Sequence, residues 1–145
     1  MDVHIIVVVM TVLTVLVTVT IHYESFVRLS DWLEKSGRRG RQRILMMVLS
    51  LIVIHGVEIG LFGLTAWGLV EFVSGSGMVV AAYSLAMTDY LYFSAITFTT
   101  LGYGEMYPDG PIRFLFSAEA LSGFALITWS ASLTFIEMQR HWRKQ

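Results

Sequence analysis

The sequence predicts an all-α integral membrane protein with three membrane-crossing helices and one short re-entrant helix. Three observations support this prediction. The 145-residue chain is 55% hydrophobic and has a mean hydropathy of +0.66, which is too apolar for a soluble domain of this size. It contains three long apolar segments. Between the second and third lies a short apolar stretch that ends in a polar sequence with two glycines, residues 100–105.

The first apolar segment, residues 5–21, carries no charge. At about 1.5 Å per residue it is long enough to cross the hydrocarbon core as a helix. Asp2 precedes it where a secretory signal would have basic residues, and no small-residue cleavage site follows. We therefore expect a retained helix.

The connector that follows, residues 22–43, predicts an amphipathic helix that ends at Gly37. Apolar residues recur at helical spacing, with charged residues on the opposite face. Such a helix either lies at the inner membrane interface or packs against a neighbouring helix, and the sequence leaves both open.

The other two apolar segments, residues 44–70 and 112–136, also have the length of spanning helices. Each contains a carboxylate, Glu58 or Glu119, and the helical rise places both at a similar depth. Because an ionised carboxylate facing lipid is costly, both should face protein.

We expect these two carboxylates to support the re-entrant helix. Their partners would be groups such as Thr97 or Tyr92, or each other, with one or both carboxyls protonated. The alternative is a pair of unrelated carboxylates, each satisfied locally.

The region between the second and third segments begins with a flexible outer loop, residues 71–87. Thr88 and Asp89 then provide an N-cap and an acidic first turn for a helix over residues 88–99. About 12 residues cannot span a bilayer, so this helix must enter the membrane and return. Pro108 and Pro111 mark the return.

Residues 100–105 read Thr-Leu-Gly-Tyr-Gly-Glu. Irregular backbone at membrane depth is tolerated only where it is buried in protein or lines a cavity. Glycine takes a positive φ without a Cβ penalty, so alternating glycines can turn successive carbonyls to one side. Four such strands around an axis would form oxygen cages that replace the hydration shell of K⁺.

The distribution of basic residues predicts the orientation in the membrane. Nine of the ten Lys and Arg residues lie in the connector or after residue 136. The positive-inside bias places both in the cytoplasm, with the N-terminus and the Gly-Tyr-Gly segment outside. We expect a multi-pass protein of the plasma membrane.

The order of spanning helix, re-entrant helix, T-x-G-Y-G motif and spanning helix resembles the pore domain of bacterial potassium channels over residues 44–137. The resemblance implies a homotetramer that conducts K⁺ passively. It implies a selectivity filter over residues 100–104 that binds K⁺ through the Thr100 hydroxyl and through the carbonyls of Thr100, Leu101, Gly102 and Tyr103, with Gly104 completing the motif. Residues 1–43, with the additional N-terminal helix, and a basic tail at 138–145 lie outside it.

The chain departs from the family in the groups that support the filter. Ile96 occupies the position of a frequent glutamate, and Glu105 replaces a commoner aspartate. Tyr92 and Phe93 stand where a Trp pair often lies. We expect filter support from Glu105, Tyr92, Thr97, Glu58 and Glu119.

The third spanning segment contains Gly123 where the family's inner helix often bends. Close helix packing is an equally weighted explanation of this glycine. Helical spacing from it predicts the wall of an inner cavity and a hydrophobic constriction at Phe124, Ile127, Ala131 and Phe135.

The histidines divide into two groups. His55 is expected to be a neutral, hydrogen-bonded core residue. His22 and His141 are placed at the inner ends of helices, where titration near neutral pH would affect an inner gate.

Other functions have weaker support. A non-conducting or regulatory membrane subunit and a weakly selective cation channel are the alternatives. We do not expect an enzyme, since the sequence shows no nucleophile–base set and no metal-ligand spacing, and without cysteine it offers no disulfide. The expected partners are further copies of the chain, the lipid bilayer and K⁺. We expect no cofactor, no nucleic acid and no ligand-binding domain.

Overall fold

A computed structural model describes residues 2–37 and 40–142, with side chains as far as Gln139. Within these residues the order of elements is α1 (Val3–Lys35), α2 (Arg41–Phe72), β1 (Met78–Val80), α3 (Met87–Phe98), β2 (Tyr107–Asp109) and α4 (Arg113–Trp142). The predicted spanning segments and the short helix are all helical.

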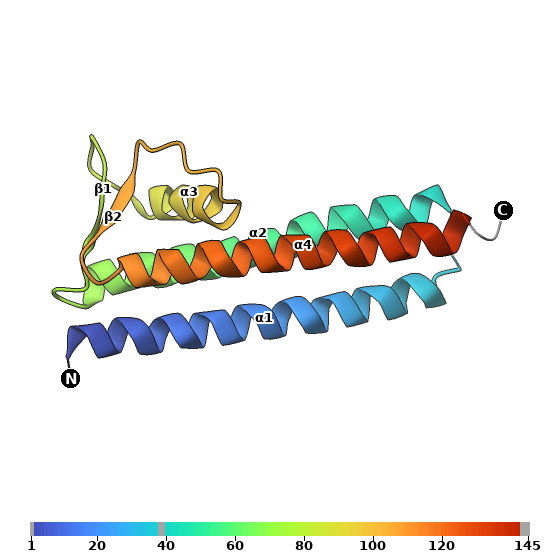
Figure 1. Cartoon of the computed structure of the whole chain (residues 1–145), viewed down its shortest axis with the longest axis horizontal. Coiled ribbons are helices and arrows are strands. Elements are labelled where there is room, and N and C mark those ends of the chain that lie inside the picture. The colour runs from blue at the N-terminus through green and yellow to red at the C-terminus, as the bar shows by residue number, and fades with distance from the viewer. Residues whose placement is uncertain (1, 38–39, 143–145) are drawn as a thin grey trace.

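Three long helices lie side by side, and α3 with the β1–β2 hairpin lies over one end of α2 and α4, on the side away from α1 (Figure 1). Three helical segments, Val3–Lys35, Arg41–Phe72 and Arg113–Gln139, are long and apolar enough to cross a membrane. The prediction of an all-α membrane protein is confirmed. At about 1.5 Å per residue each long helix exceeds a ~30 Å hydrocarbon core, so its ends extend beyond it.

Helix α1 differs from the prediction in its length. It is one continuous helix of 33 residues that includes most of the connector. Leu33, near its end, is fully buried and packs with Met47 and Leu51 of α2. The connector is therefore a helix that packs on a neighbour, which was one of the two alternatives.

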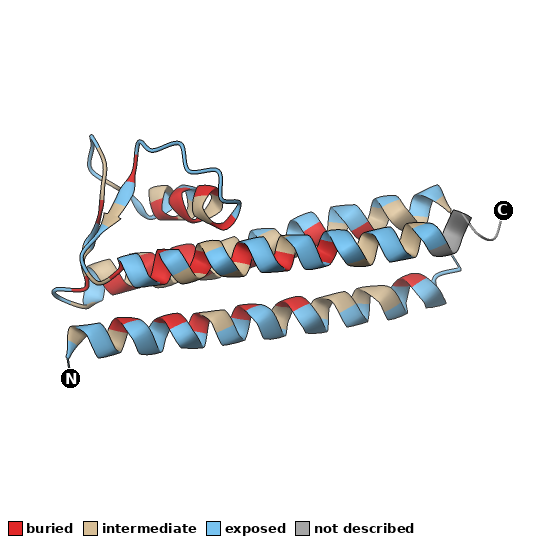
Figure 2. Cartoon of the chain, viewed as in Figure 1, coloured by how far each residue is buried: buried red, intermediate tan, exposed pale blue. Residues whose placement is uncertain are grey.

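A polar stripe runs along the face of α1 that meets α2 and α4. Thr11, Thr14, Thr18 and His22 recur every three or four residues, and all four are buried (Figure 2). Residues at this spacing share one helix face. Thr14 Oγ1 lies 3.2 Å from Thr65 Oγ1 of α2. The rest of α1 is largely exposed and apolar, as expected of a face in contact with lipid.

The region between α2 and α4 contains two features that were not predicted. The first is the hairpin, in which β1 pairs antiparallel with β2 and Met78 lies opposite Asp109. The second is the cap of α3: the N-cap is Ala86, whereas Thr88 was predicted, and the predicted acidic first turn with Asp89 is confirmed. Asp89 lies in the first turn and accepts the Ala86 amide at 2.7 Å. An acidic residue in the first turn also stabilises the N-terminal end of a helix through the helix dipole.

Candidate functional site

The irregular backbone after α3, residues 100–105, alternates between negative and positive φ. We call it the strand, although it belongs to neither β1 nor β2. Thr100, Gly102 and Gly104 have φ values of 57°, 50° and 89°. Among the described residues, Thr100 is the one non-glycine residue with a positive φ. For a β-branched residue this conformation is an outlier that costs roughly 1–3 kcal/mol. Such strain persists where the surrounding structure fixes it, and it is common at functional sites.

Hydrogen bonds to α3 fix the direction of the first carbonyls in this strand. The amides of Leu101 and Gly102 both donate to the carbonyl of Ile96, at 2.9 and 3.1 Å. All described peptide bonds are trans, so the carbonyl of each peptide unit points opposite to its N–H. The carbonyls of Thr100 and Leu101 therefore both point away from α3, next to each other.

The face onto which these carbonyls point is uncovered in the single chain. Residues 99–105 are all exposed (Figure 2). The side chains of Leu101 and Tyr103 are 56% and 67% exposed. These exposed side chains leave this edge open to contact with another molecule.

Gly123 of α4 lies against the end of α3. A Cβ at this position would lie 2.1 Å from the Phe98 carbonyl oxygen, well inside contact distance. Phe98 is fully buried, and its ring lies 6.4 Å from that of Phe62. Helix α4 continues through Gly123 without interruption. The structure thus gives Gly123 a role in close packing, which holds the base of the strand in place.

Glu119 of α4 is fully buried and hydrogen-bonds Ser94 of α3. Ser94 Oγ also lies 2.7 Å from the carbonyl oxygen of Ile59 in α2. A hydroxyl has one proton, so if Ser94 donates to Ile59 it must accept from a protonated Glu119. The second oxygen of Glu119 is buried and has no hydrogen-bond partner among the described residues. A neutral carboxylic acid fits this environment, because a buried carboxylate without partners is very costly.

Glu119 thus contacts the re-entrant helix α3, and its partner there is a residue that was not predicted. We expected Thr97 or Tyr92 to bind the buried carboxylates, and Ser94 is the residue of α3 that binds Glu119. The signal in the sequence was a lone serine between the apolar residues Phe93 and Ala95. Thr97 contributes through its carbonyl, which accepts the Thr100 amide at 2.9 Å.

At the end of the strand, Tyr92 ties α3 to the residue that follows the glycines. Its hydroxyl donates to Glu105 Oε1 at 2.5 Å. This hydrogen bond to a carboxylate, with desolvation and the nearby negative charge adding to it, raises the pKa of Tyr92 to about 12. Ser94 and Tyr92 thus connect α3 to α4 and to the end of the strand, respectively.

Glu58 contradicts the expectation that it supports α3. Its two oxygens lie 2.7 Å from His22 Nδ1 and 2.8 Å from His55 Nδ1. His22 is fully buried and lies within α1, which continues to Lys35, so its placement at the end of a helix was wrong. His55 is hydrogen-bonded as expected. The side chain of His141 lies outside the described residues.

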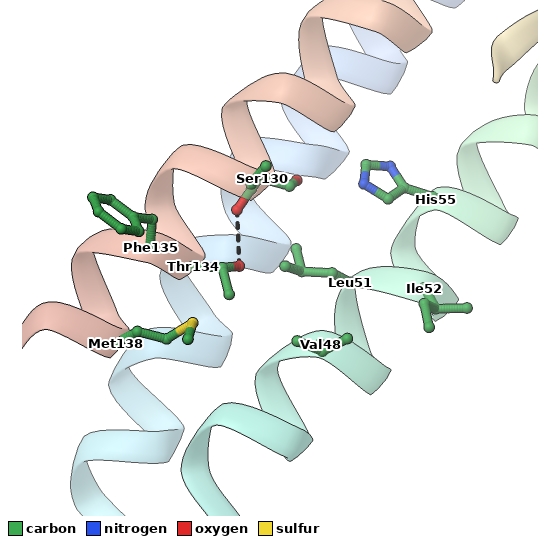
Figure 3. Close-up of a pocket in the computed structure, with 9 residues that line it drawn as sticks. Val48, Leu51, Ile52, His55, Ser130, Thr134, Phe135 and Met138 are labelled. Atoms are coloured by element: carbon green, nitrogen blue, oxygen red, sulfur yellow. Dashed lines mark hydrogen bonds between the residues drawn. The ribbon is translucent and has the colours of Figure 1, made fainter. Parts of the chain in front are cut away.

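The four residues predicted for the inner cavity lie on α4 with different exposures. Phe124, Ala131 and Phe135 are exposed, whereas Ile127 is partly buried against the core. Ala131 and Phe135 also line a cavity of about 360 Å³ between α2 and α4 (Figure 3). The role of these residues in a pore stays a prediction.

Comparison with known proteins identifies the family. A family model described as ion channel matches residues 48–140. No curated protein and no solved structure matches the chain. The matched region is more than half of the chain and contains α3, the 100–105 strand and most of α2 and α4, whereas α1 lies outside it. The chain therefore belongs to the ion channel family.

Proposed function

We propose that this ion channel is selective for potassium and conducts K⁺ passively through a pore formed by four copies of the chain. The observation that carries the proposal is the strand at 100–104. Its alternating φ values and its amide bonds to Ile96 direct adjacent carbonyls away from α3, onto an exposed edge. Potassium filters are built from rings of backbone carbonyls that replace the water around the ion.

The uncovered edge supports assembly around an axis. One chain presents carbonyls on one side of an ion, so a closed cage requires copies related by rotational symmetry. In the proposed tetramer the K⁺ sites are formed by the Thr100 hydroxyl and by the carbonyls of residues 100–103. The same contacts would bury exposed side chains such as Leu101 and Tyr103. The complete motif favours selective conduction over the weakly selective and non-conducting alternatives.

The proposed orientation places α3 and the hairpin on the outer side. The α1–α2 connection and the C-terminal end of α4 lie at the opposite end of the molecule (Figure 1). Described basic residues gather near that end, including Lys35, Arg41 and Arg43. By the positive-inside bias this end faces the cytoplasm.

Flux through purified protein in liposomes tests the proposal. We expect K⁺ to move down its gradient and Na⁺ to move far more slowly. Gly102→Ala should abolish K⁺ flux, because a Cβ at a φ of 50° costs about 1–2 kcal/mol per subunit in left-handed backbone. Gly68→Ala is the control, since Gly68 lies within α2 without a positive φ and a Cβ there meets nothing within 4 Å. Equal K⁺ and Na⁺ flux, or unchanged flux in Gly102→Ala, would contradict potassium selectivity at this strand.

A further inference from the structure

A group of metal-ligating side chains lies outside the filter, at the junction of α1, α2 and α4. We call it the His–Glu cluster and define it as His22, His55 and Glu58. Two members come from α2 and one from α1, and their ligand atoms all lie within 4.8 Å of one another. His22 and Glu58 are fully buried.

A bound cation would compensate the negative charge of the His–Glu cluster. A carboxylate between two neutral imidazoles carries a net charge of −1, and such a charge is costly in an apolar interior unless it is compensated. Among the described residues, the ion-pair partners of Glu58 are His22 and His55, and no Lys or Arg is paired with it. A bound proton or a metal ion would supply the missing positive charge.

The donor set selects the class of metal. Two imidazoles and one carboxylate are typical ligands of Zn²⁺ and of related divalent transition metals. Mg²⁺ and Ca²⁺ prefer sites made only of oxygen ligands. The Glu58 oxygens now lie 2.7 and 2.8 Å from the two Nδ1 atoms. Tetrahedral Zn²⁺ with ligands at ~2.0–2.1 Å separates them by roughly 3.3 Å, which small side-chain rotations supply.

The opposite nitrogen of His22 already has an oxygen atom as a hydrogen-bond partner, as metal-bound histidines do. Ser130 Oγ of α4 lies 3.3 Å from His22 Nε2. With a metal on Nδ1, the neutral imidazole carries its proton on Nε2 and donates it to Ser130. Outer hydrogen bonds of this kind orient metal-binding histidines.

His55 provides a route from the surface to the cluster. Its side chain is partly buried and lines the 360 Å³ cavity between α2 and α4 (Figure 3). The cavity exposes His55, while the rest of its lining is mainly apolar and adds no further nitrogen or carboxylate ligand. In a zinc site with three protein ligands the fourth position is taken by water.

We infer that the His–Glu cluster binds one Zn²⁺ or similar divalent transition-metal ion per chain. The ion would be held by Nδ1 of His22, Nδ1 of His55 and the Glu58 carboxylate. It would fasten α1 to α2, and through Ser130 its position would also depend on α4.

The test uses the purified full-length protein without a polyhistidine tag, dialysed against ZnCl₂. We expect one Zn²⁺ per chain, with X-ray absorption showing two imidazoles at ~2.0–2.1 Å. His22→Gln and His55→Gln should each weaken Zn²⁺ binding by about 100-fold or more, because loss of an outer partner alone costs ~10–100-fold. His4→Gln is the matched control: His4 lies on α1 but is exposed and 18 positions away from His22. It should bind Zn²⁺ like the wild type.

Thermal unfolding provides a second measurement. Zn²⁺ should raise the Tm of the wild type and of His4→Gln, and it should not raise the Tm of His55→Gln. Absence of stoichiometric Zn²⁺ in the wild type, an absorption spectrum with oxygen ligands alone, or wild-type affinity in both histidine variants would each overturn the inference. If neither variant folds, the wild-type spectrum decides. None of these measurements depends on conduction, so their failure would leave the proposed potassium channel untouched.

Discussion

The two buried carboxyl groups of this channel have contrasting surroundings. Glu119 has a single described partner, the hydroxyl of Ser94, and one of its oxygens is left unpaired. Glu58 has an imidazole on each oxygen. Imidazole can carry positive charge, whereas a serine hydroxyl cannot. The first site therefore suits a neutral acid, and the second can hold a carboxylate. The difference shows that equal burial does not imply equal charge.

The two sites also join different parts of the molecule. Glu119 connects α4 to α3 within the region matched to the ion channel family. Glu58 connects α2 to His22 of α1, which lies outside that region. One carboxyl thus supports the helix that carries the strand, while the other attaches the additional helix.

The largest loss of stability is expected from an alanine at Gly123, in contrast to an alanine near the His–Glu cluster. Gly123→Ala places a Cβ 2.1 Å from the Phe98 carbonyl oxygen, and backbone cannot yield as a flexible side chain can. Overpacking of this kind costs roughly 1–3 kcal/mol or more. We expect a lower Tm and loss of the assembled protein on size exclusion. Gly56→Ala, next to the His–Glu cluster, meets nothing within 4 Å and should leave both unchanged. Equal tolerance of the two would contradict tight packing at α3.

The different surroundings of Glu58 and Glu119 predict that replacing each of them by glutamine changes the stability by different amounts. Glu58→Gln leaves one of the two imidazole N–H groups facing an amide NH2 instead of a carboxylate oxygen, and this unsatisfied buried donor should reduce the free energy of unfolding by roughly 1–3 kcal/mol. Glu119→Gln replaces a neutral acid by a neutral amide, which can still bond Ser94, so less than about 1 kcal/mol is expected. Thermal unfolding in the same detergent measures both. A larger loss in Glu119→Gln would show that Glu119 is the ionised one.

The smallest effect concerns the hydrogen bond of Tyr92, which links α3 to the end of the strand. The pKa of Tyr92 rises from its ordinary 10.0 to about 12 because it donates to Glu105. The contribution of this bond is fully present below pH 10 and is lost as the pH rises through about 12. In an ultraviolet titration the wild type should keep a phenol protonated above pH 11 that Tyr92→Phe lacks. Identical titration of the two proteins would exclude the bond in solution.

The sequence predicted the elements whose signal is local. The long apolar segments gave the spanning helices, and the T-x-G-Y-G motif located the strand whose φ values alternate. The short strands of the hairpin were missed because three residues each carry too little pattern. The continuity of α1 was missed because the polar residues from His22 onward suggested a separate amphipathic helix.

The His–Glu cluster could not be predicted from spacing. His55 and Glu58 are three positions apart and share a helix face, but His22 precedes His55 by 33 positions on another helix. Such a cluster depends on how α1 packs against α2. The stripe of Thr11, Thr14 and Thr18 was the available signal, because it places His22 on the buried face of α1.

Electron cryo-microscopy of the purified protein in K⁺ tests the central claim most directly. We predict four copies around one axis, with residues 100–104 of each lining it and a row of ion densities between their carbonyls. A monomer or dimer, or an axis without ion density beside Thr100 to Tyr103, would contradict the account.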